Sequence, residues 1–168
     1  DGLILLGYGD YTTYEARLRE LIAQGTHFAR WGSVSSDTSG ATIGSDNLGA
    51  GRLVGEHLLA EGRRRIAFIG HADGHYPEFA HRYDGLCDVL RGAGIEPDPA
   101  LQRDAITTEE AGLSATRDLI ASGARFDAIF AGSDLIAIGA MRALAEAGLS
   151  VPGDVAVVGF DDIPSASL

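Results

Sequence analysis

Five polar residues of this sequence could bind a ligand and stand where a predicted strand ends or a predicted helix begins: Asp46, Arg82, Ser133, Asp134 and Asp161. Carboxylates accept and a guanidinium donates strongly oriented hydrogen bonds, which suits hydroxyl or amide groups of a small molecule. The Ser and Asp side chains could instead cap helices by accepting from the free N–H groups of a first turn. Capping is the favoured interpretation for Asp134, and ligand contact is favoured for Arg82 and Asp161.

The stretch from Phe126 to Asp162 must position three of these residues, Ser133, Asp134 and Asp161. Its runs Asp127–Ala131 and Val155–Gly159 are continuously apolar, as is typical of parallel strands buried on both faces, and the segment between them has helical apolar spacing. In a parallel sheet the carboxyl ends of the strands meet in one crevice, where ligands bind. The residues that follow the two strands, Ser133 and Asp161, are therefore expected to converge on one site.

Strand-like and helix-like segments alternate along the whole chain. This order predicts an α/β fold with a mostly parallel sheet and right-handed crossovers. A helix is expected from Asn47 through Ala60 and another over His81–Arg91, preceded by a loop over His71–Ala80. Further strands are expected at Gly2–Leu6, which should be buried, and at His27–Trp31, Thr42–Ser45, Ile66–Gly70 and Leu101–Ala105.

The order of segments fits two αβ lobes. We expect residues 1–62 to form a first lobe and residues 63–160 a second, with residues 161–168 crossing back toward the first. The run Arg63–Arg65 is the candidate crossover between them, and a solvated connector is favoured over a nucleic-acid patch because three basic residues are a weak signal.

The composition excludes several classes of protein. The 168 residues are 45% hydrophobic and carry a formal net charge of −11, which argues against binding nucleic acid through a basic face. A single cysteine, Cys87, excludes an internal disulfide framework and fits a reducing compartment, so a cytoplasmic location is expected. The apolar runs are far shorter than a bilayer span, so no membrane partner is expected.

An enzyme on a dinucleotide-binding fold is one alternative. Gly7-Tyr8-Gly9 follows a predicted strand, but Thr12 stands where the dinucleotide fingerprint needs its third glycine. The adjacent Asp161 and Asp162 should point in opposite directions at a strand end, so they cannot act together on one substrate. We therefore expect no cofactor and no catalysis.

A metal site is a second alternative. His71, Asp73, His75 and His81 are close in sequence, but their spacing lacks the helical geometry that aims two imidazoles at one ion. An ordinary polar loop is favoured, and no metal is expected.

Five motifs resemble the LacI/GalR-type, or lactose-repressor, family of transcription regulators. They are Asp46–Ala50, Gly62–Gly70, Arg82 with Gly85, Gly132–Asp134 with Gly139, and the highly specific Val151–Pro164. The resemblance covers nearly the whole chain. It implies the effector-binding core of such a regulator, with a periplasmic-binding-protein type I-like fold of two lobes around a cleft and the first lobe only partly present.

The resemblance also implies a set of ligand-binding residues. Asp46 contributes from the first lobe, and Arg82, Ser133 and Asp161 contribute from the second, with Thr107 near the mouth. Aromatic residues complete the set: Tyr76 and Phe79 could stack on a sugar ring, and Tyr8 and Trp31 could line the first-lobe wall.

The partners implied are a small-molecule effector, expected to be a carbohydrate, and DNA, bound through a helix-turn-helix headpiece absent from this chain. A homodimer is also implied. The alternative from transport is a periplasmic sugar-binding protein of an ABC transporter, which shares the same cleft and fold.

Overall fold

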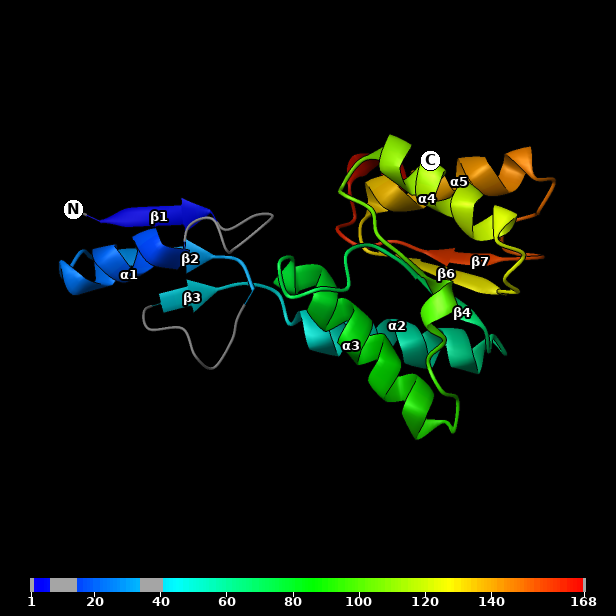
Figure 1. Cartoon of the computed structure of the whole chain (residues 1–168), viewed down its shortest axis with the longest axis horizontal. Coiled ribbons are helices and arrows are strands. Elements are labelled where there is room, and N and C mark those ends of the chain that lie inside the picture. The colour runs from blue at the N-terminus through cyan, green and yellow to red at the C-terminus, as the bar shows by residue number, and fades with distance from the viewer. Residues whose placement is uncertain (1, 7–14, 34–40, 168) are drawn as a thin grey trace.

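Two parallel sheets organise the part of the chain that the structure, a computed structural model, describes: residues 2–6, 15–33 and 41–167 (Figure 1). The first sheet has the order β1-β2-β3 and contains β1 (Leu3–Leu6), β2 (Phe28–Trp31) and β3 (Ala41–Ile43). The second has the order β5-β4-β6-β7 and contains β4 (Ile66–Ile69), β5 (Gln102–Arg103), β6 (Ala128–Ala131) and β7 (Ala156–Val158).

Every strand pair in the two sheets is parallel, which confirms the predicted α/β fold. Parallel neighbours need crossover connections, and helices supply them. Within the first sheet the helix is α1 (Glu15–Ala23). Within the second sheet the helices are α3 (Pro77–Gly92), α4 (Glu109–Ala121) and α5 (Asp134–Glu146), while α2 (Asn47–Ala60) follows β3 and precedes β4. Two short 3-10 turns, Pro99–Leu101 and Pro164–Ser167, complete the described elements.

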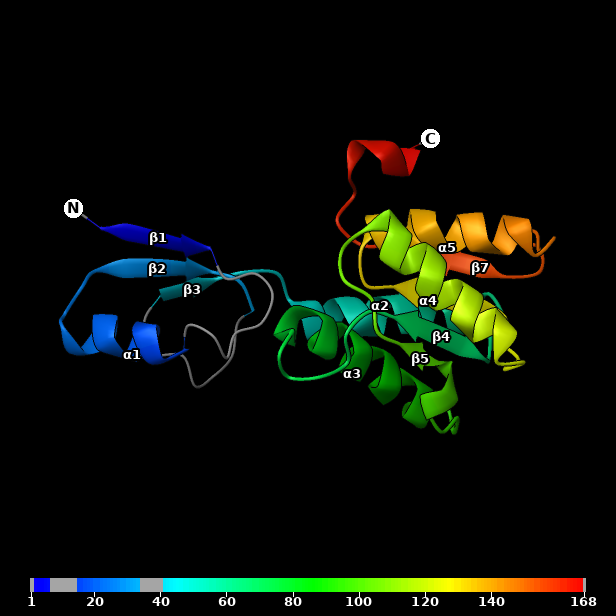
Figure 2. The same ribbon diagram turned by 45° about the horizontal axis from the view of Figure 1, so that its top comes forward.

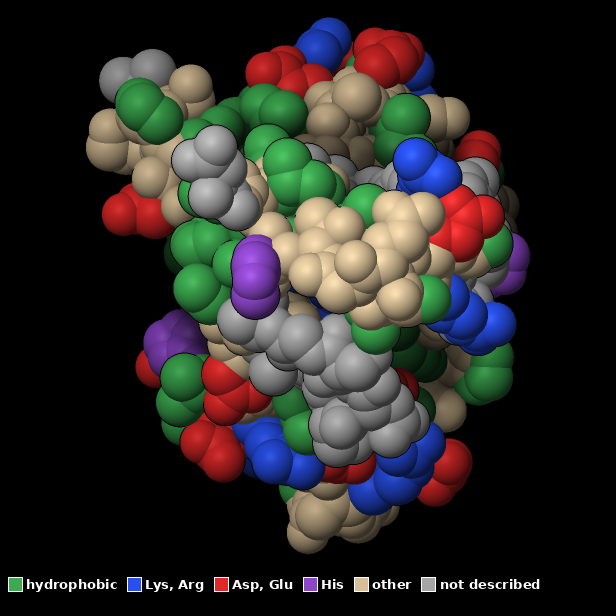
Figure 3. All heavy atoms as spheres, turned by 90° about the vertical axis from the view of Figure 1, so that its left-hand side faces the viewer, with side chains coloured by type: hydrophobic (Ala, Val, Ile, Leu, Met, Phe, Trp, Pro, Cys, Tyr) green, Lys and Arg blue, Asp and Glu red, His purple; other side chains and the backbone are tan. Residues whose placement is uncertain are grey.

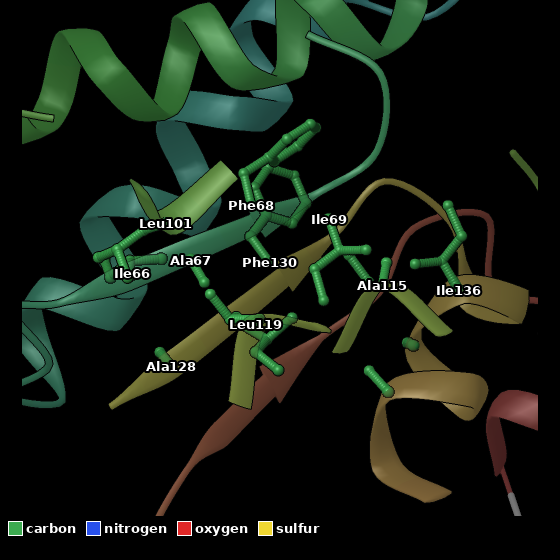
Figure 4. Packing of buried hydrophobic residues seen from close by; sticks show 14 of the residues in the cluster. Ile66, Ala67, Phe68, Ile69, Leu101, Ala115, Leu119, Ala128, Phe130 and Ile136 are labelled. Carbon is green, nitrogen blue, oxygen red and sulfur yellow. The ribbon is translucent and has the colours of Figure 1, made fainter. Parts of the chain in front are cut away.

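The second sheet lies between two helix pairs, α2 with α3 on one face and α4 with α5 on the other (Figures 1 and 2). All residues of β4 and β6 are buried, as the continuous apolar runs predicted. The rings of Phe68 and Phe130 meet edge to face with their centroids 5.4 Å apart, and Leu119 packs from α4 into the same core (Figure 4). This core fixes the ends of β4, β6 and β7 relative to one another.

Helix α2 packs against α3 and belongs to this second layer. The helices approach closely at glycines: a Cβ on Gly51 would lie 2.1 Å from the Arg82 carbonyl oxygen, and one on Gly85 would lie 2.2 Å from that of Leu48. Leu58 of α2 is 1% exposed in the core. The predicted division after residue 62 therefore does not follow the packing. We define the first lobe as β1–β3 with α1 and the second lobe as α2 through β7.

The run Arg63–Arg65 consequently does not join the lobes. It leads from α2 into β4 within the second lobe, and Asp127 anchors it by accepting from the backbone N–H of Arg64 and of Arg65, at 2.9 and 3.0 Å. The side chain of Arg63 donates to the Pro152 carbonyl at 2.6 Å. A structural connector, rather than a crossover, is the observed role.

Two other predictions differ from the structure. Strand β1 forms where expected but is not buried: Ile4 is 79% exposed, because β1 has β2 as its one neighbour among the described residues. Helix α3 begins at Pro77 rather than at His81, since proline is well suited to the first helical position. This earlier start places Glu78 and Phe79 on a rigid helix instead of a loop. No helix in the described ranges has the length and apolar character needed to cross a membrane.

Candidate ligand-binding cleft

A cleft of about 570 Å³ opens where the two lobes meet, a size within the usual range for small-molecule sites. The first lobe contributes the end of β2, and the second contributes the start of α3 and the segments that follow β5, β6 and β7. Its lining residues are Trp31, Gly32, Ser45, Asn47, Tyr76, Glu78, Phe79, Arg82, Ile106, Thr107, Ser133, Phe160 and Asp161.

Arg82 is the buried cation of this cleft, with 7% of its surface exposed. Its Nε donates to Oδ1 of Asn47 at 2.9 Å, and its Nη1 donates to the Gly132 carbonyl at the end of β6. The guanidinium carbon lies 3.5 Å from the centre of the Phe160 ring and 5.4 Å from that of Phe79, so cation–π attraction adds to the hydrogen bonds. These contacts hold the planar fork in one orientation.

Arg82 keeps its positive charge although its side chain is buried. Desolvation lowers the pKa of the guanidinium to about 10, while the nearby carboxylates of Asp161 and Glu78 oppose that change. A group with this pKa stays protonated near neutral pH. Among the described residues Nη2 has no hydrogen-bond acceptor, so a donor remains available to a ligand.

Asp161 presents the opposing carboxylate at the end of β7. Its φ of 115° and the φ of 56° at Asp162 both lie in a region that non-glycine residues rarely adopt, although Asp tolerates it better than most. The carboxyl is open to the cleft, yet partial desolvation raises its pKa, with Asp134 adding to the rise and Arg82 opposing it. Two consecutive residues with positive φ therefore shape the turn after β7 that presents Asp161 to the cleft.

The sequence left helix capping and ligand contact open for Ser133 and Asp134, and the structure gives the two residues different roles. Ser133 is the residue that caps α5: its Oγ accepts from the Ile136 N–H at 3.4 Å. Asp134, for which helix capping was predicted, instead braces the turn after β7. Its backbone N–H donates to the Phe160 carbonyl at 2.8 Å, and its Oδ2 accepts from the Ile163 N–H at 2.9 Å. Asp134 therefore holds both ends of the turn that carries Asp161.

Asp46 does not lie among the residues that line the cleft. Its Oδ1 accepts from the Gly49 N–H at 2.8 Å and caps α2, so the capping interpretation applies here. Its neighbours Ser45 and Asn47 line the cleft in its place. Asn47 is 4% exposed and orients Arg82, a role that its position next to a helix start did not reveal.

The predicted aromatic residues Trp31, Tyr76 and Phe79 line the cleft, as does Thr107. Trp31 is 49% exposed, and Tyr76 stacks on His71 with ring centroids 4.1 Å apart. Tyr8 lies outside the described residues. Glu78 and Phe160 also line the cleft but were not predicted from the sequence. Phe160 directly precedes Asp161 in the Val151–Pro164 motif and could have been found there.

The histidines considered for a metal site have other neighbours. His81 Nδ1 lies 3.0 Å from Oγ of Ser33, and His71 Nδ1 lies 3.7 Å from a carboxylate oxygen of Asp104. No group of three or more metal-ligating side chains occurs within the described ranges. The free Cys87 is buried, and its burial raises the pKa of the thiol.

Comparison with known proteins fits this geometry. Residues 55–168 match the family described as periplasmic binding protein-like domain. The transcriptional regulator CelR of Thermobifida fusca is 39% identical over 117 residues, which is 70% of this chain and 34% of that regulator. A LacI-family regulatory protein of Chloroflexus aggregans has a similar structure, with a TM-score of 0.88, 28% identity, and coverage of 99% of this chain and 59% of that one.

A solved complex of CelR with cellobiose is also similar, with a TM-score of 0.85, 33% identity, and coverage of 96% of this chain and 49% of that one. The chain spans between about a third and a half of the length of the first curated relatives it matches. The chain belongs to the periplasmic binding protein-like domain family, and its relatives are LacI-family transcription regulators. The resemblance found in the sequence motifs and the fold that it implied are both confirmed.

Proposed function

We propose that this chain is the effector-binding core of a LacI-type transcription regulator and that a neutral, hydroxyl-rich molecule, a carbohydrate, binds in its cleft. One observation carries the proposal: Arg82 and Asp161, distant in sequence, line the same cleft together with aromatic rings. A guanidinium and a carboxylate recognise hydroxyl groups by donating and accepting, and aromatic faces cover the apolar face of a sugar. The complex of the similar CelR with cellobiose supports this ligand class.

Each lining residue has a role in this proposal. Asp161 accepts from ligand hydroxyls and Nη2 of Arg82 donates to a ligand oxygen. Trp31, Tyr76 and Phe79 supply apolar contact, and Ser133 and Thr107 supply hydroxyl groups. Asp46 acts indirectly, by capping the helix whose first residue, Asn47, orients Arg82.

The regulation follows from a change in how the lobes are arranged. A ligand that contacts both lobes binds the closed arrangement better than the open one and shifts the population toward it. A coupling of about 1–3 kcal/mol between effector and DNA binding is enough for measurable control. DNA contact belongs to a helix-turn-helix outside this chain, in keeping with the net charge of −11 here. On the face that Figure 3 shows, acidic and basic side chains are interspersed and form no basic patch among the described residues.

The proposal includes a homodimer in the cytoplasm and no catalysis. Met141, 47% exposed on α5, offers an apolar contact for a second copy. The relatives are regulators rather than exported transport proteins, which favours regulation over the transport alternative.

The test is calorimetric titration of the full-length protein with cellobiose, glucose, ribose and adenine. We expect one of the sugars to bind, Asp161→Asn to weaken it by about tenfold or more because a charged acceptor is lost, and adenine not to bind. Asp88→Ala serves as the control, since Asp88 on α3 pairs with Arg52 on α2 outside the cleft. If Asp161→Asn and the wild type bind the sugar with the same affinity, the sugar does not bind in this cleft.

A further inference from the structure

Ser33, Glu78 and His81 join the two lobes beside the cleft. Ser33 follows β2 in the first lobe, and the other two residues lie in the first turns of α3 in the second. The Ser33 backbone N–H donates to Oε1 of Glu78 at 2.9 Å, and Ser33 Oγ lies 3.0 Å from Nδ1 of His81. We propose that these three residues form an interlobe latch that favours the closed arrangement of the lobes in the absence of effector and so sets the affinity of the site.

The latch matters because the described helices and strands of the two lobes make few contacts with each other. In the described ranges no strand or helix of the first lobe packs extensively against an element of the second; the extensive contacts are all within one lobe or the other. Among the described residues, apolar burial therefore contributes little to closure, so polar contacts between the lobes carry more of the balance between open and closed states. Ser33 is 3% exposed, so its bonds are shielded from water, which strengthens them.

Glu78 connects this latch to the ligand site. It lines the cleft, and its charge acts on the Arg82 guanidinium, raising the pKa of that group against the effect of burial. It also lies in the first turn of α3, where the helix dipole favours a carboxylate. One side chain thus contacts the opposite lobe and faces the group proposed to hold the effector.

The consequence is a built-in preference for the closed state. When only a fraction of the protein is competent to bind, the apparent dissociation constant rises in inverse proportion to that fraction. A latch that favours closure keeps the fraction high and the affinity tight. This inference about affinity rests on the proposed function, whereas the latch itself is defined by contacts that need no effector.

The first experiment follows amide hydrogen exchange in the full-length, effector-free protein, using peptides that cover residues 28–33. We expect Glu78→Ala to speed exchange at the Ser33 amide by about tenfold, because its acceptor is lost. Glu78→Gln keeps an oxygen that can accept and should restore most of the protection. Asp88→Ala, which removes a carboxylate of the same helix that pairs with Arg52 and Arg91, should have no effect. Equal exchange in wild type and Glu78→Ala would overturn the latch.

The second experiment measures affinity for cellobiose in variants of Ser33 and His81. Ser33 is not a lining residue, so Ser33→Ala reports on closure rather than on ligand contact. We expect Ser33→Ala and His81→Ala each to weaken binding about fivefold, and the double variant to be no weaker than either, because both remove one shared contact. If the losses of affinity in the two single variants add in the double variant, or if Ser33→Ala loses no affinity, the latch does not set the affinity of the site. If cellobiose does not bind the wild type, the sugar that binds in the calorimetric titration takes its place. If no sugar binds, the proposed ligand class fails, and the exchange experiment still decides the latch.

Discussion

The centre of the Phe160 ring lies 3.5 Å from the guanidinium carbon of Arg82. The ring follows β7 and the guanidinium comes from α3, so this contact joins two separate walls of the cleft. Through Nη1 the same guanidinium also reaches the carbonyl of Gly132 after β6, and through Nε it reaches Asn47 at the start of α2. Arg82 is therefore a structural centre of the second lobe as well as a candidate ligand contact.

Loss of Arg82 should destabilise the protein as well as its site. Arg82→Ala leaves Oδ1 of Asn47 and the Gly132 carbonyl without their donor, and we expect a loss of about 3 kcal/mol in the free energy of unfolding. Arg82→Lys keeps the charge but not the fork, so an intermediate loss is expected. Urea unfolding measures both. Arg52→Ala, at an exposed arginine, is the control and should cost less than about 1 kcal/mol. A loss no larger for Arg82→Ala than for Arg52→Ala would contradict the structural role.

Asp161 should make stability depend on pH in a defined direction. Its pKa is raised in the folded state, so the folded protein binds a proton more tightly than the unfolded chain does, and stability falls as the pH rises through that folded pKa. Asp161→Asn removes this effect. Thermal unfolding should show the variant to be more stable than wild type near pH 7, with the advantage shrinking toward about pH 4. A variant that is less stable than wild type at pH 7 would show that the Arg82 charge, rather than desolvation, dominates.

Asp134 should matter because it holds the turn that aims Asp161. Asp134→Ala removes the acceptor of the Ile163 N–H and should cost about 1–3 kcal/mol of stability. It should also weaken effector binding, since the left-handed conformation at Asp161 persists only where its surroundings hold it. Asp134→Asn retains an oxygen that can accept and should recover part of both losses. Asp118→Ala, at an exposed position of α4, provides the comparison in the same assays.

The close packing of α2 on α3 can be tested with two glycine substitutions on α3, one at the contact and one away from it. Gly85→Ala would place its Cβ 2.2 Å from the Leu48 carbonyl oxygen, so the helices must separate, and we expect a loss of about 1–3 kcal/mol. Gly92→Ala meets nothing within 4 Å and should be neutral or stabilising by up to about 1 kcal/mol, because alanine favours the helix. Denaturant midpoints of the two variants measure the difference. Equal effects would mean that the helices are not in close contact in solution.

The sequence predicted the fold well where burial decided the pattern. The continuous apolar runs at β4 and β6 marked central strands, and the residues after β6 and β7 converged as the rule for parallel sheets requires. The sequence did not predict the features that depend on how elements pack against one another. Nothing in the spacing of α2 showed which sheet it would cover, and the apolar run of β1 did not reveal its exposure.

The residues that line the cleft could be placed from the sequence only in part, for a similar reason. Arg82 and Asp161 could be placed because a strand end or a helix start sets their position. Glu78 and Asn47 could not be placed, because their roles depend on contacts with residues distant in the sequence. Glu78 contacts Ser33, 45 positions away, and Asn47 contacts Arg82, 35 positions away. Asp46 caps α2 and is not among the lining residues. A residue before a helix can face either the ligand or its own helix, and the sequence does not distinguish the two.

The short link between the lobes has a mechanical consequence. β3 ends at Ile43 and α2 begins at Asn47, so only Gly44, Ser45 and Asp46 separate a first-lobe strand from the residue that orients Arg82. A swing of the first lobe therefore pivots directly beside Asn47. Because Oδ1 of Asn47 accepts from Arg82, a tilt of the first lobe that moves Asn47 would also reorient the guanidinium.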